Sequence, residues 1–145
     1  MGTGNSRNFK NTAGASMPGL PIFIGGDYEV KSNRYYIMQY VKGFIKWREL
    51  TLILGEKNDV LNKSKYGLTI IVDSLDLINQ IKLFDVGRNS VYDLATWAYV
   101  ILNSDIFCYV KSEEQDLKDC LFAILNEKEI DMAFLQKILR RLREI

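Results

Sequence analysis

The first six residues, Met1-Gly2-Thr3-Gly4-Asn5-Ser6, carry a spacing with a defined chemistry. In N-myristoylation the initiator methionine is removed, the amine of the following glycine is acylated, and a serine or threonine stands four residues further on. One myristoyl chain binds a membrane only marginally, so a second, basic signal is required. We therefore expect Gly2 to carry an acyl chain that works together with a basic surface.

Residues 31–65 could supply that surface, because they hold eight Lys and Arg against three acidic residues, interleaved with aromatic residues. This combination suits anionic lipid headgroups, where Trp and Tyr lie at the interface. It equally suits single-stranded nucleic acid, with phosphates on the cations and bases on the rings. A third interpretation places the aromatic rings in the core and the lysines on its solvated rim. The residues predicted to bind lipid or nucleic acid are Tyr40, Lys42, Lys46, Trp47 and Arg48.

The last sixteen residues combine an apolar seam with a basic surface. Leu135, Ile138, Leu142 and Ile145 are spaced to form a narrow stripe along one helix face. Between two copies, this helix would pair with the acidic segment 113–119 and drive self-association. Within one copy, the same seam closes the core, and the positive charges complement the helix macrodipole. The residues predicted to mediate self-association are Leu135, Ile138, Arg140, Arg141 and Leu142.

Histidine is absent from the sequence, which restricts the possible chemistry. Its absence removes the usual general base, the Ser–His–Asp and Cys–His nucleophile systems and the commonest zinc ligand. Two cysteines, in apolar surroundings and without Cys-rich spacing, cannot complete a zinc site and indicate a reduced intracellular compartment. Asp73 and Asp76 could hold a metal ion, but their spacing is typical of a helix cap. We therefore expect a non-enzymatic protein with no metal and no cofactor.

The charge is unevenly distributed although the net charge is only +1. Residues 1–72 carry ten Lys and Arg against five Asp and Glu, whereas residues 73–145 carry nine against thirteen. The acidic half is compatible with a cytosolic inhibitor or immunity-type protein that blocks an enzyme through a charged face. Alternatively, the two halves fold against each other, or one half meets an anionic partner.

Several secondary-structure elements must position these residues. Residues 1–21, rich in glycine and proline, are predicted to be a flexible arm, and residues 22–145 a single globular domain. Residues 35–47 fit a helix that opens after Ser32 or Asn33, although their aromatic and β-branched residues also suit a strand. Residues 75–84 fit either a strand or a helix capped by Ser74. Strands are predicted at residues 51–54, 68–72 and 106–110, with a polar loop at residues 56–65.

The last third is predicted to be mainly helical. Ser90 and Asp93 form a capping box for a helix that begins at residue 91, and Ser112 with Gln115 suggests a second one. That second helix is predicted to stop near Asn126, and a final helix follows it. The predicted fold class is α+β, a small mixed sheet packed by C-terminal helices, because strands come mainly before helices.

The Gly2-to-Ser6 pattern, the chain size and the charge layout resemble the matrix-type proteins of enveloped viruses. Such proteins bind membranes and assemble beneath them. The resemblance implies a cytoplasmic protein at the inner face of a membrane or in a virion, with an acyl chain on Gly2. It also implies that Lys42, Lys46 and Arg48 meet lipid headgroups. The leading hypothesis is therefore a membrane-associated assembly protein, with an enzyme inhibitor or a single-strand nucleic-acid binder as alternatives.

Overall fold

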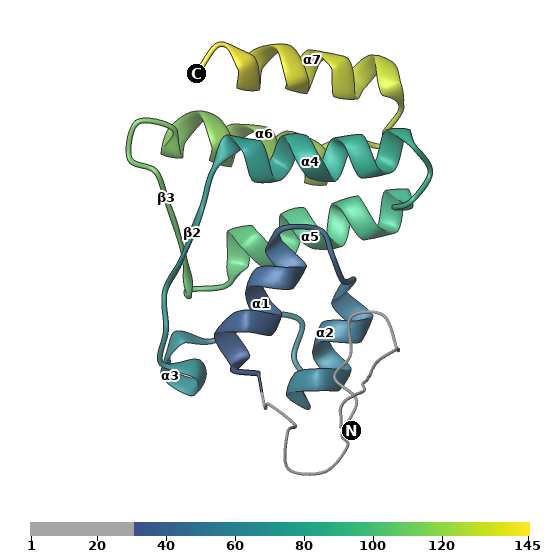
Figure 1. Cartoon of the computed structure of the whole chain (residues 1–145). Coiled ribbons are helices and arrows are strands. Elements are labelled where there is room, and N and C mark those ends of the chain that lie inside the picture. Colours follow the sequence, from purple (N-terminus) through teal and green to yellow (C-terminus); the bar gives the residue numbers. More distant parts are fainter. Residues whose placement is uncertain (1–30) are drawn as a thin grey trace, which may run out of the picture. The chain divides into compact units, whose positions relative to one another are not determined.

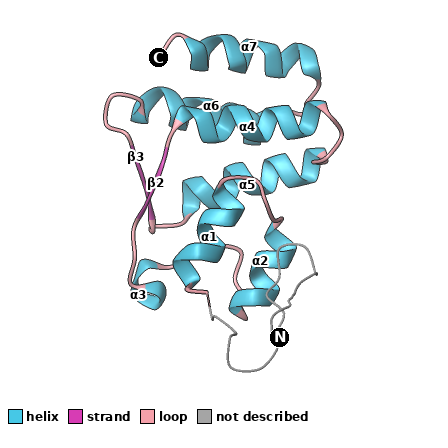
Figure 2. Cartoon of the chain, in the orientation of Figure 1, coloured by secondary structure: helices cyan, strands magenta, loops and turns pink. Residues whose placement is uncertain are grey.

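Seven helices and two short strands form the part of the chain that the computed structural model describes, residues 31–145 (Figures 1 and 2). The elements are α1 (Asn33–Val41), α2 (Trp47–Leu54), α3 (Lys63–Tyr66), β2 (Ile70–Val72), α4 (Ser74–Asp85), α5 (Val91–Asn103), β3 (Phe107–Tyr109), α6 (Glu114–Asn126) and α7 (Met132–Arg143). Residues 36–145 form one compact unit. The fold class is α+β, as predicted, but helices dominate it. The predicted arm at residues 1–21 lies outside the described residues.

The two strands pair in parallel, with Ile70 opposite Phe107 and Val72 opposite Tyr109. Helices α4 and α5 lie between them in the sequence, as a parallel pair requires a long crossover connection. The predicted strands at residues 68–72 and 106–110 are therefore confirmed. A mixed sheet was predicted. Within the described residues the sheet has two strands, β2 and β3, and they pair in parallel.

Residues 51–54 are the second half of α2, so the prediction of a strand there was wrong. The helix starts four residues earlier, where the Lys46 N–H donates to Glu49 Oε1 at 2.8 Å. It ends at Gly55, whose φ of +67° is a left-handed conformation that glycine adopts without strain. A short apolar run before a glycine suits either element, and here the packing of α2 on α5, with Leu50 buried, selects the helix.

The chain turns sharply after α1, which begins at Asn33 as predicted but ends at Val41, short of residue 47. Gly43 has a φ of +89°, and a Cβ there would lie 2.7 Å from Leu83 Cδ1 on α4. The Lys42 carbonyl accepts a hydrogen bond from Asn79 Nδ2 at 2.8 Å. Because Gly43 has no side chain, the loop between α1 and α2 can lie directly on α4. This contact places the start of α2.

The starts of α4 and α5 follow local capping rules. Residues 75–84 are helical, and Asp73 rather than Ser74 is the N-cap, with the Asp76 N–H donating to Asp73 Oδ1 at 3.1 Å. The predicted capping box of α5 is confirmed, since the Asp93 N–H donates to Ser90 Oγ and the Ser90 N–H to Asp93 Oδ2. Both helices therefore begin where a carboxylate or hydroxyl satisfies their first free N–H groups.

The predicted capping box at the start of α6 is absent from the structure of this region. The N-cap is Glu113 and makes no side-chain cap, while Gln115 donates to Asp119 Oδ1 at 2.8 Å. The Glu113 carboxylate instead accepts the Ser74 N–H at 2.9 Å, so it serves the start of α4. This partner, 39 residues away, cannot be inferred from local spacing. The end of α6 at Asn126 is as predicted.

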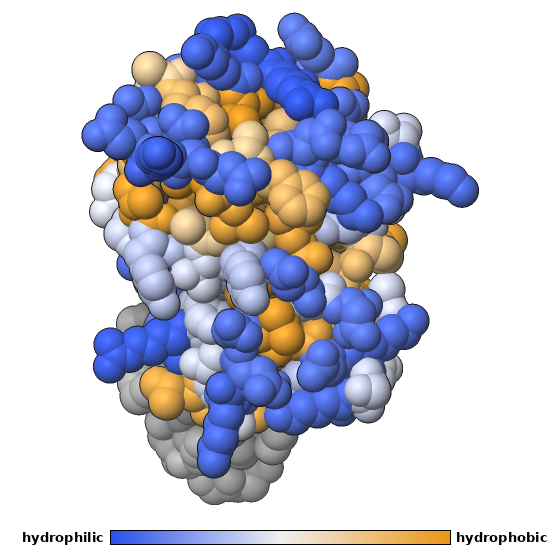
Figure 3. Space-filling model, turned by 180° about the vertical axis from the view of Figure 1, so that it is seen from behind, coloured by the Kyte–Doolittle hydropathy of each residue, from blue (hydrophilic) through white to orange (hydrophobic). Residues whose placement is uncertain are grey.

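Helix α7 packs on α4 and α6 and closes the core. Its apolar side chains Leu135, Ile138, Leu139 and Leu142 are all buried, and Trp97 is the largest fully buried side chain of the core. The predicted seam is therefore used within one copy, except for Ile145, which is exposed and lies beyond the end of α7. Figure 3 shows hydrophilic side chains crowding over this end of residues 36–145, with apolar surface between them. No helix within residues 31–145 is both long and apolar enough to cross a bilayer.

The predicted polar loop at residues 56–65 contains a buried carboxylate. Glu56 accepts hydrogen bonds from Tyr66 Oη, from Lys65 Nζ at 3.1 Å and from the N–H groups of Lys57 and Asn58. The Tyr66 hydrogen bond, opposed by burial and aided by Asn58 and Lys65, lowers the pKa of Glu56 from 4.5 to about 2. Leu61 is also buried, so this segment is anchored at both a polar and an apolar point.

Glu56→Gln is expected to destabilise the domain by about 2 kcal/mol at neutral pH, because charge-assisted hydrogen bonds are lost. Since the folded pKa lies below the ordinary value, the carboxylate stabilises the fold fully above pH 4.5 and less as the pH falls toward 2. Urea unfolding at pH 7 and pH 3 measures this, and the difference from wild type should shrink at pH 3. Glu129→Gln, at an exposed carboxylate, is the matched control. An equal loss for both variants would contradict the assignment.

Candidate functional site

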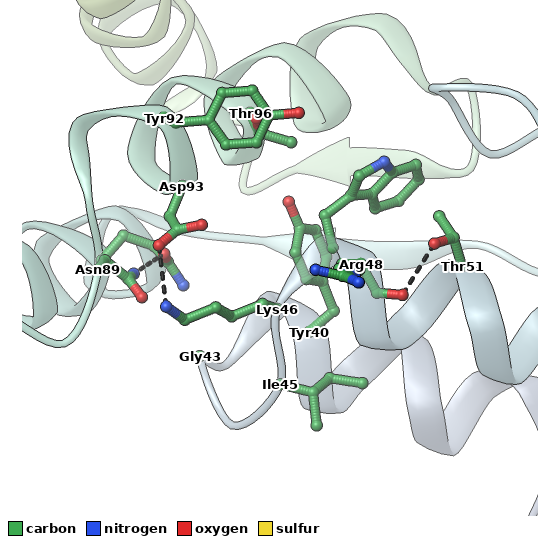
Figure 4. A pocket seen from close by; sticks show the side chains of 12 residues that line it. Tyr40, Gly43, Ile45, Lys46, Arg48, Thr51, Asn89, Tyr92, Asp93 and Thr96 are labelled. Atoms are coloured by element: carbon green, nitrogen blue, oxygen red, sulfur yellow. Dashed lines mark hydrogen bonds and ion pairs between the residues drawn. The ribbon is translucent and has the colours of Figure 1, made fainter.

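A pocket of about 520 Å³ opens within the unit formed by residues 36–145. It lies between the end of α1, the turn into α2, the first turn of α2 and the N-terminal half of α5 (Figure 4), and Gln80 of α4 also lines it. Its volume falls in the range of pockets that take small organic molecules. The lining residues are Tyr40, Gly43, Ile45, Lys46, Trp47, Arg48, Thr51, Gln80, Asn89, Tyr92, Asp93 and Thr96.

Tyr40 contributes a buried hydroxyl to the pocket. The residue is only 3% exposed, and its Oη has no hydrogen-bond partner within residues 31–145. Burial, with smaller contributions from Asp93 and Tyr92, raises the pKa of Tyr40 above its ordinary value of 10. The hydroxyl therefore stays protonated and can donate. The ring packs against the half-buried Trp47, with centroids 5.5 Å apart at an interplanar angle of 56°.

Two cations and one carboxylate line the pocket. Lys46 Nζ lies 3.0 Å from Asp93 Oδ2, and the same oxygen accepts the Ser90 N–H at 2.8 Å. Burial alone would raise the pKa of Asp93, but the hydrogen bond from Ser90 and the ion pair with Lys46 hold it below its ordinary value. Arg48 is exposed and forms no ion pair with any residue from 31 to 145. The lining thus keeps one uncompensated positive charge.

The first turns of two helices meet at this pocket. Trp47 and Arg48 open α2, and Tyr92 and Asp93 stand in the first turn of α5. Both helix N-termini carry the positive end of the helix macrodipole, and the first turn of α2 also has free N–H groups, whereas the Asp93 N–H of α5 already donates to Ser90 Oγ. The unpaired Arg48 and the free N–H groups of α2 therefore favour an anion at this end of the pocket.

The α4 side of the pocket carries an ordered amide pair. Gln80 is buried, and its Oε1 accepts a hydrogen bond from Asn89 Nδ2 at 2.9 Å. This bond joins α4 to the loop before α5. Because the Asn89 amide nitrogen donates to the Gln80 amide oxygen, the orientation of both amides is fixed. The remaining amide atoms therefore offer a donor and an acceptor at defined positions in the pocket wall.

Four of the five residues predicted to bind lipid or nucleic acid lie around this pocket: Tyr40, Lys46, Trp47 and Arg48. Lys42 is separated from them, because α1 ends before it and the two lysines share no helix face. Its Nζ lies 2.7 Å from Asp76 Oδ1, whose side chain is 4% exposed. The hydrogen bond to Asp76 raises the pKa of Lys42. Burial of Tyr40 likewise places its ring below the surface rather than at a lipid interface.

The residues predicted to mediate self-association lie elsewhere. Leu135, Ile138 and Leu142 are buried in the core, and Arg140 is exposed. Arg141 bonds within the same chain to Asp116 Oδ1 at 3.0 Å and Asp119 Oδ2 at 2.9 Å. The predicted attraction between the basic final helix and the acidic segment is thus present inside one copy. Gly2 lies outside the described residues.

The pocket residues on α4 and α5 were not predicted as site residues. Asp93 was assigned to a helix cap, which is correct, but its other contact is the Lys46 ammonium. Tyr92 follows that cap and is 74% exposed. An aromatic residue in the first turn of a capped helix is the one sequence feature that marks Tyr92, and no site was predicted there. Among residues 31–145, no group of three or more His, Cys, Asp or Glu could hold a metal ion.

Function has to be inferred from this geometry. Comparisons with models of known protein families, with curated proteins and with solved structures found no match to this chain.

Proposed function

We propose that this domain binds a small anionic ligand, rich in hydrogen-bond acceptors, in the pocket between α1, α2 and α5. The observation that carries the proposal is the Tyr40 hydroxyl, which is buried and has no partner within the described chain. An unpaired buried hydroxyl costs about 1–3 kcal/mol relative to a paired one. Trp97 Nε1 is also unpaired within residues 31–145, but of the two atoms only the Tyr40 hydroxyl belongs to a residue that lines the pocket, where an acceptor atom of a bound ligand accounts for it.

The remaining lining residues support the same ligand chemistry. Arg48, the Lys46 ammonium and the protonated Tyr40 hydroxyl are donors, and the one carboxylate, Asp93, already accepts two hydrogen bonds through a single oxygen. The walls are aromatic, with Trp47 on α2 and Tyr92 on α5. A ligand with an anionic group and a planar ring matches both features.

Membrane association through an acylated Gly2, self-assembly and enzyme inhibition stay predictions from the sequence. Lys42 and Lys46 offer less to a lipid surface than expected, because each is paired with a carboxylate. On α7, Lys137, Arg140 and Arg143 are exposed cations without ion pairs within residues 31–145. The apolar side of α7 is buried, so this helix would meet an anionic surface through charge alone.

The test compares Tyr40→Phe and Arg48→Gln with wild type against three probes: indole-3-carboxylate, a naphthalene sulfonate and adenosine 5′-monophosphate. At least one probe should bind in calorimetry. Tyr40→Phe should weaken that binding about fivefold, since one hydrogen bond is lost. Arg48→Gln should weaken it about tenfold, since a charge-assisted contact is lost. The matched controls are Tyr99→Phe and Arg140→Gln, whose side chains lie outside the pocket lining.

Tyr40→Phe also has a stability signature that separates binding from a structural role. Because the hydroxyl has no partner within residues 31–145, its removal should leave the melting temperature unchanged or raise it. Lower affinity with equal or higher stability is the expected pair of results. Absence of binding by all three probe classes, or equal binding by wild type and both pocket variants, would refute the proposal.

A further inference from the structure

We infer that the ligand is a nucleotide, with its phosphate at Arg48 and the N-terminus of α2 and its base against Trp47. This inference rests on the proposed ligand-binding function and names the class of ligand. Trp47 and Arg48 are the first two residues of α2, and both side chains line the pocket. A nucleotide carries both a planar ring and a phosphate, the two groups that an indole and a guanidinium bind.

The phosphate half of the inference depends on Arg48. Its guanidinium is exposed and has no ion pair within the described chain, and its planar fork of donors matches phosphate oxygens. The free N–H groups of the first turn of α2 add donors at the same end of the helix. Lys46, at the N-cap, brings a second cation that Asp93 neutralises in part. A dianionic phosphate gains more from this arrangement than a carboxylate does.

The base half depends on two rings and the buried hydroxyl. Trp47 packs on Tyr40, which holds the indole in place, while Tyr92 comes from the opposite wall on α5. Figure 4 shows Tyr40 and Arg48 on one side of the pocket and Tyr92 with Thr96 on the other. Bases stack on aromatic side chains of this kind without regard to sequence. The unpaired Tyr40 hydroxyl is a donor for a ring nitrogen or carbonyl, which bases carry at their edges.

Simpler ligands leave part of this pocket unused. Inorganic phosphate would pair with Arg48 but leave the rings and the Tyr40 hydroxyl without a partner. A purely apolar ligand would fill the space but satisfy neither the hydroxyl nor the guanidinium. The same nucleotide chemistry has two sources, a free nucleoside monophosphate and the phosphorylated end of a single-stranded nucleic acid. The experiment below distinguishes them.

The experiment titrates the full chain with the four ribonucleoside 5′-monophosphates, the matching nucleosides and inorganic phosphate, followed by calorimetry. At least one monophosphate should bind about tenfold or more tightly than its nucleoside and than phosphate alone, because both halves of the pocket are then used. Trp47→Leu and Arg48→Gln should each weaken that binding about tenfold. Arg140→Gln should bind as wild type does.

A second arm compares short single-stranded oligonucleotides that carry a 5′-phosphate with the same oligonucleotides ending in a 5′-hydroxyl. Tighter binding of the phosphorylated oligonucleotide than of the mononucleotide identifies a strand end as the source. Tighter binding of the mononucleotide identifies free nucleotide. Arg48 is exposed, so Arg48→Gln keeps the test valid if Trp47→Leu fails to fold, which circular dichroism reports.

Two results would overturn the inference. If the monophosphates bind no more tightly than inorganic phosphate, the aromatic rings do not contribute to binding. If Arg48→Gln leaves the monophosphate affinity unchanged, the phosphate does not bind at Arg48. If the carboxylate or sulfonate probe still binds and responds to Tyr40→Phe, the nucleotide inference fails while the proposed binding function stands. If no probe of any class binds, both fail.

Discussion

Leu142→Asp is expected to unfold the domain at room temperature or bring it close to unfolding. Leu142 is 2% exposed and lies on the face of α7 that packs on α4 and α6. The substitution removes buried apolar surface and places an uncompensated charge in the core, at a cost of roughly 4 kcal/mol or more. Because small domains have stabilities of about 5–15 kcal/mol, a loss of this size consumes much of the total.

The control is Arg140→Asp, at an exposed position on the same helix, which should cost well under 1 kcal/mol. Circular-dichroism melts and urea titrations measure both variants, and light scattering on wild type and Leu142→Asp reports the oligomeric state. If Leu142→Asp kept the wild-type melt and lost an oligomer, the seam would be an interface between copies. In that case self-association through α7 would regain its support.

Lys42→Met is expected to destabilise the domain by about 3 kcal/mol. The sequence had instead predicted Lys42 as a surface residue that binds lipid or nucleic acid. The Asp76 side chain is 4% exposed and lies 2.7 Å from Lys42 Nζ. Removing the ammonium leaves a buried carboxylate with only the Asp73 N–H, at 3.0 Å, as a described partner. An unpaired buried charge of this kind is strongly unfavourable, whereas loss of an exposed ion pair costs little.

Urea unfolding of Lys42→Met beside Lys57→Met, at an exposed lysine, measures the difference. Adding Asp76→Asn should recover most of the loss, because the neutral amide no longer needs a counterion and can still accept from Asp73. Equal stability of Lys42→Met and Lys57→Met would show that the pair contributes nothing. Failure of Asp76→Asn to recover stability would assign the loss to the packing of the lysine chain instead.

Local hydrogen bonds explain which elements could be predicted from the sequence. The start of α5 depends on Ser90 and Asp93, three residues apart, and the buried stripe of α7 follows from a repeating apolar spacing. Interactions of this range are visible in any sequence window. The start of α6 was mispredicted because Glu113 has its partner on α4, and residues 51–54 were mispredicted because a short apolar run suits a helix or a strand.

The unequal charge of the two halves was visible in the sequence, but the ion pairs that it forms in the folded chain were not. Two ion pairs, Lys42 with Asp76 and Lys46 with Asp93, join the basic half to the acidic half within one chain. This favours the interpretation in which the halves fold against each other. Each pair spans 34 residues or more, and neither the partners nor the burial of one carboxylate follows from composition.

The sequence by itself determined that residues 31–65 hold both basic side chains of the candidate site and two of its three aromatic rings, Tyr40 and Trp47. Only the tertiary structure decided which of them act together. Lys42 and Lys46 are equivalent in a helical projection, yet one is held by Asp76 and the other lines the pocket. The physical reason is the turn at Gly43, where a left-handed backbone and a missing Cβ end α1 against α4. That turn brings Trp47 and Arg48 to face α5, more than forty residues further along the chain.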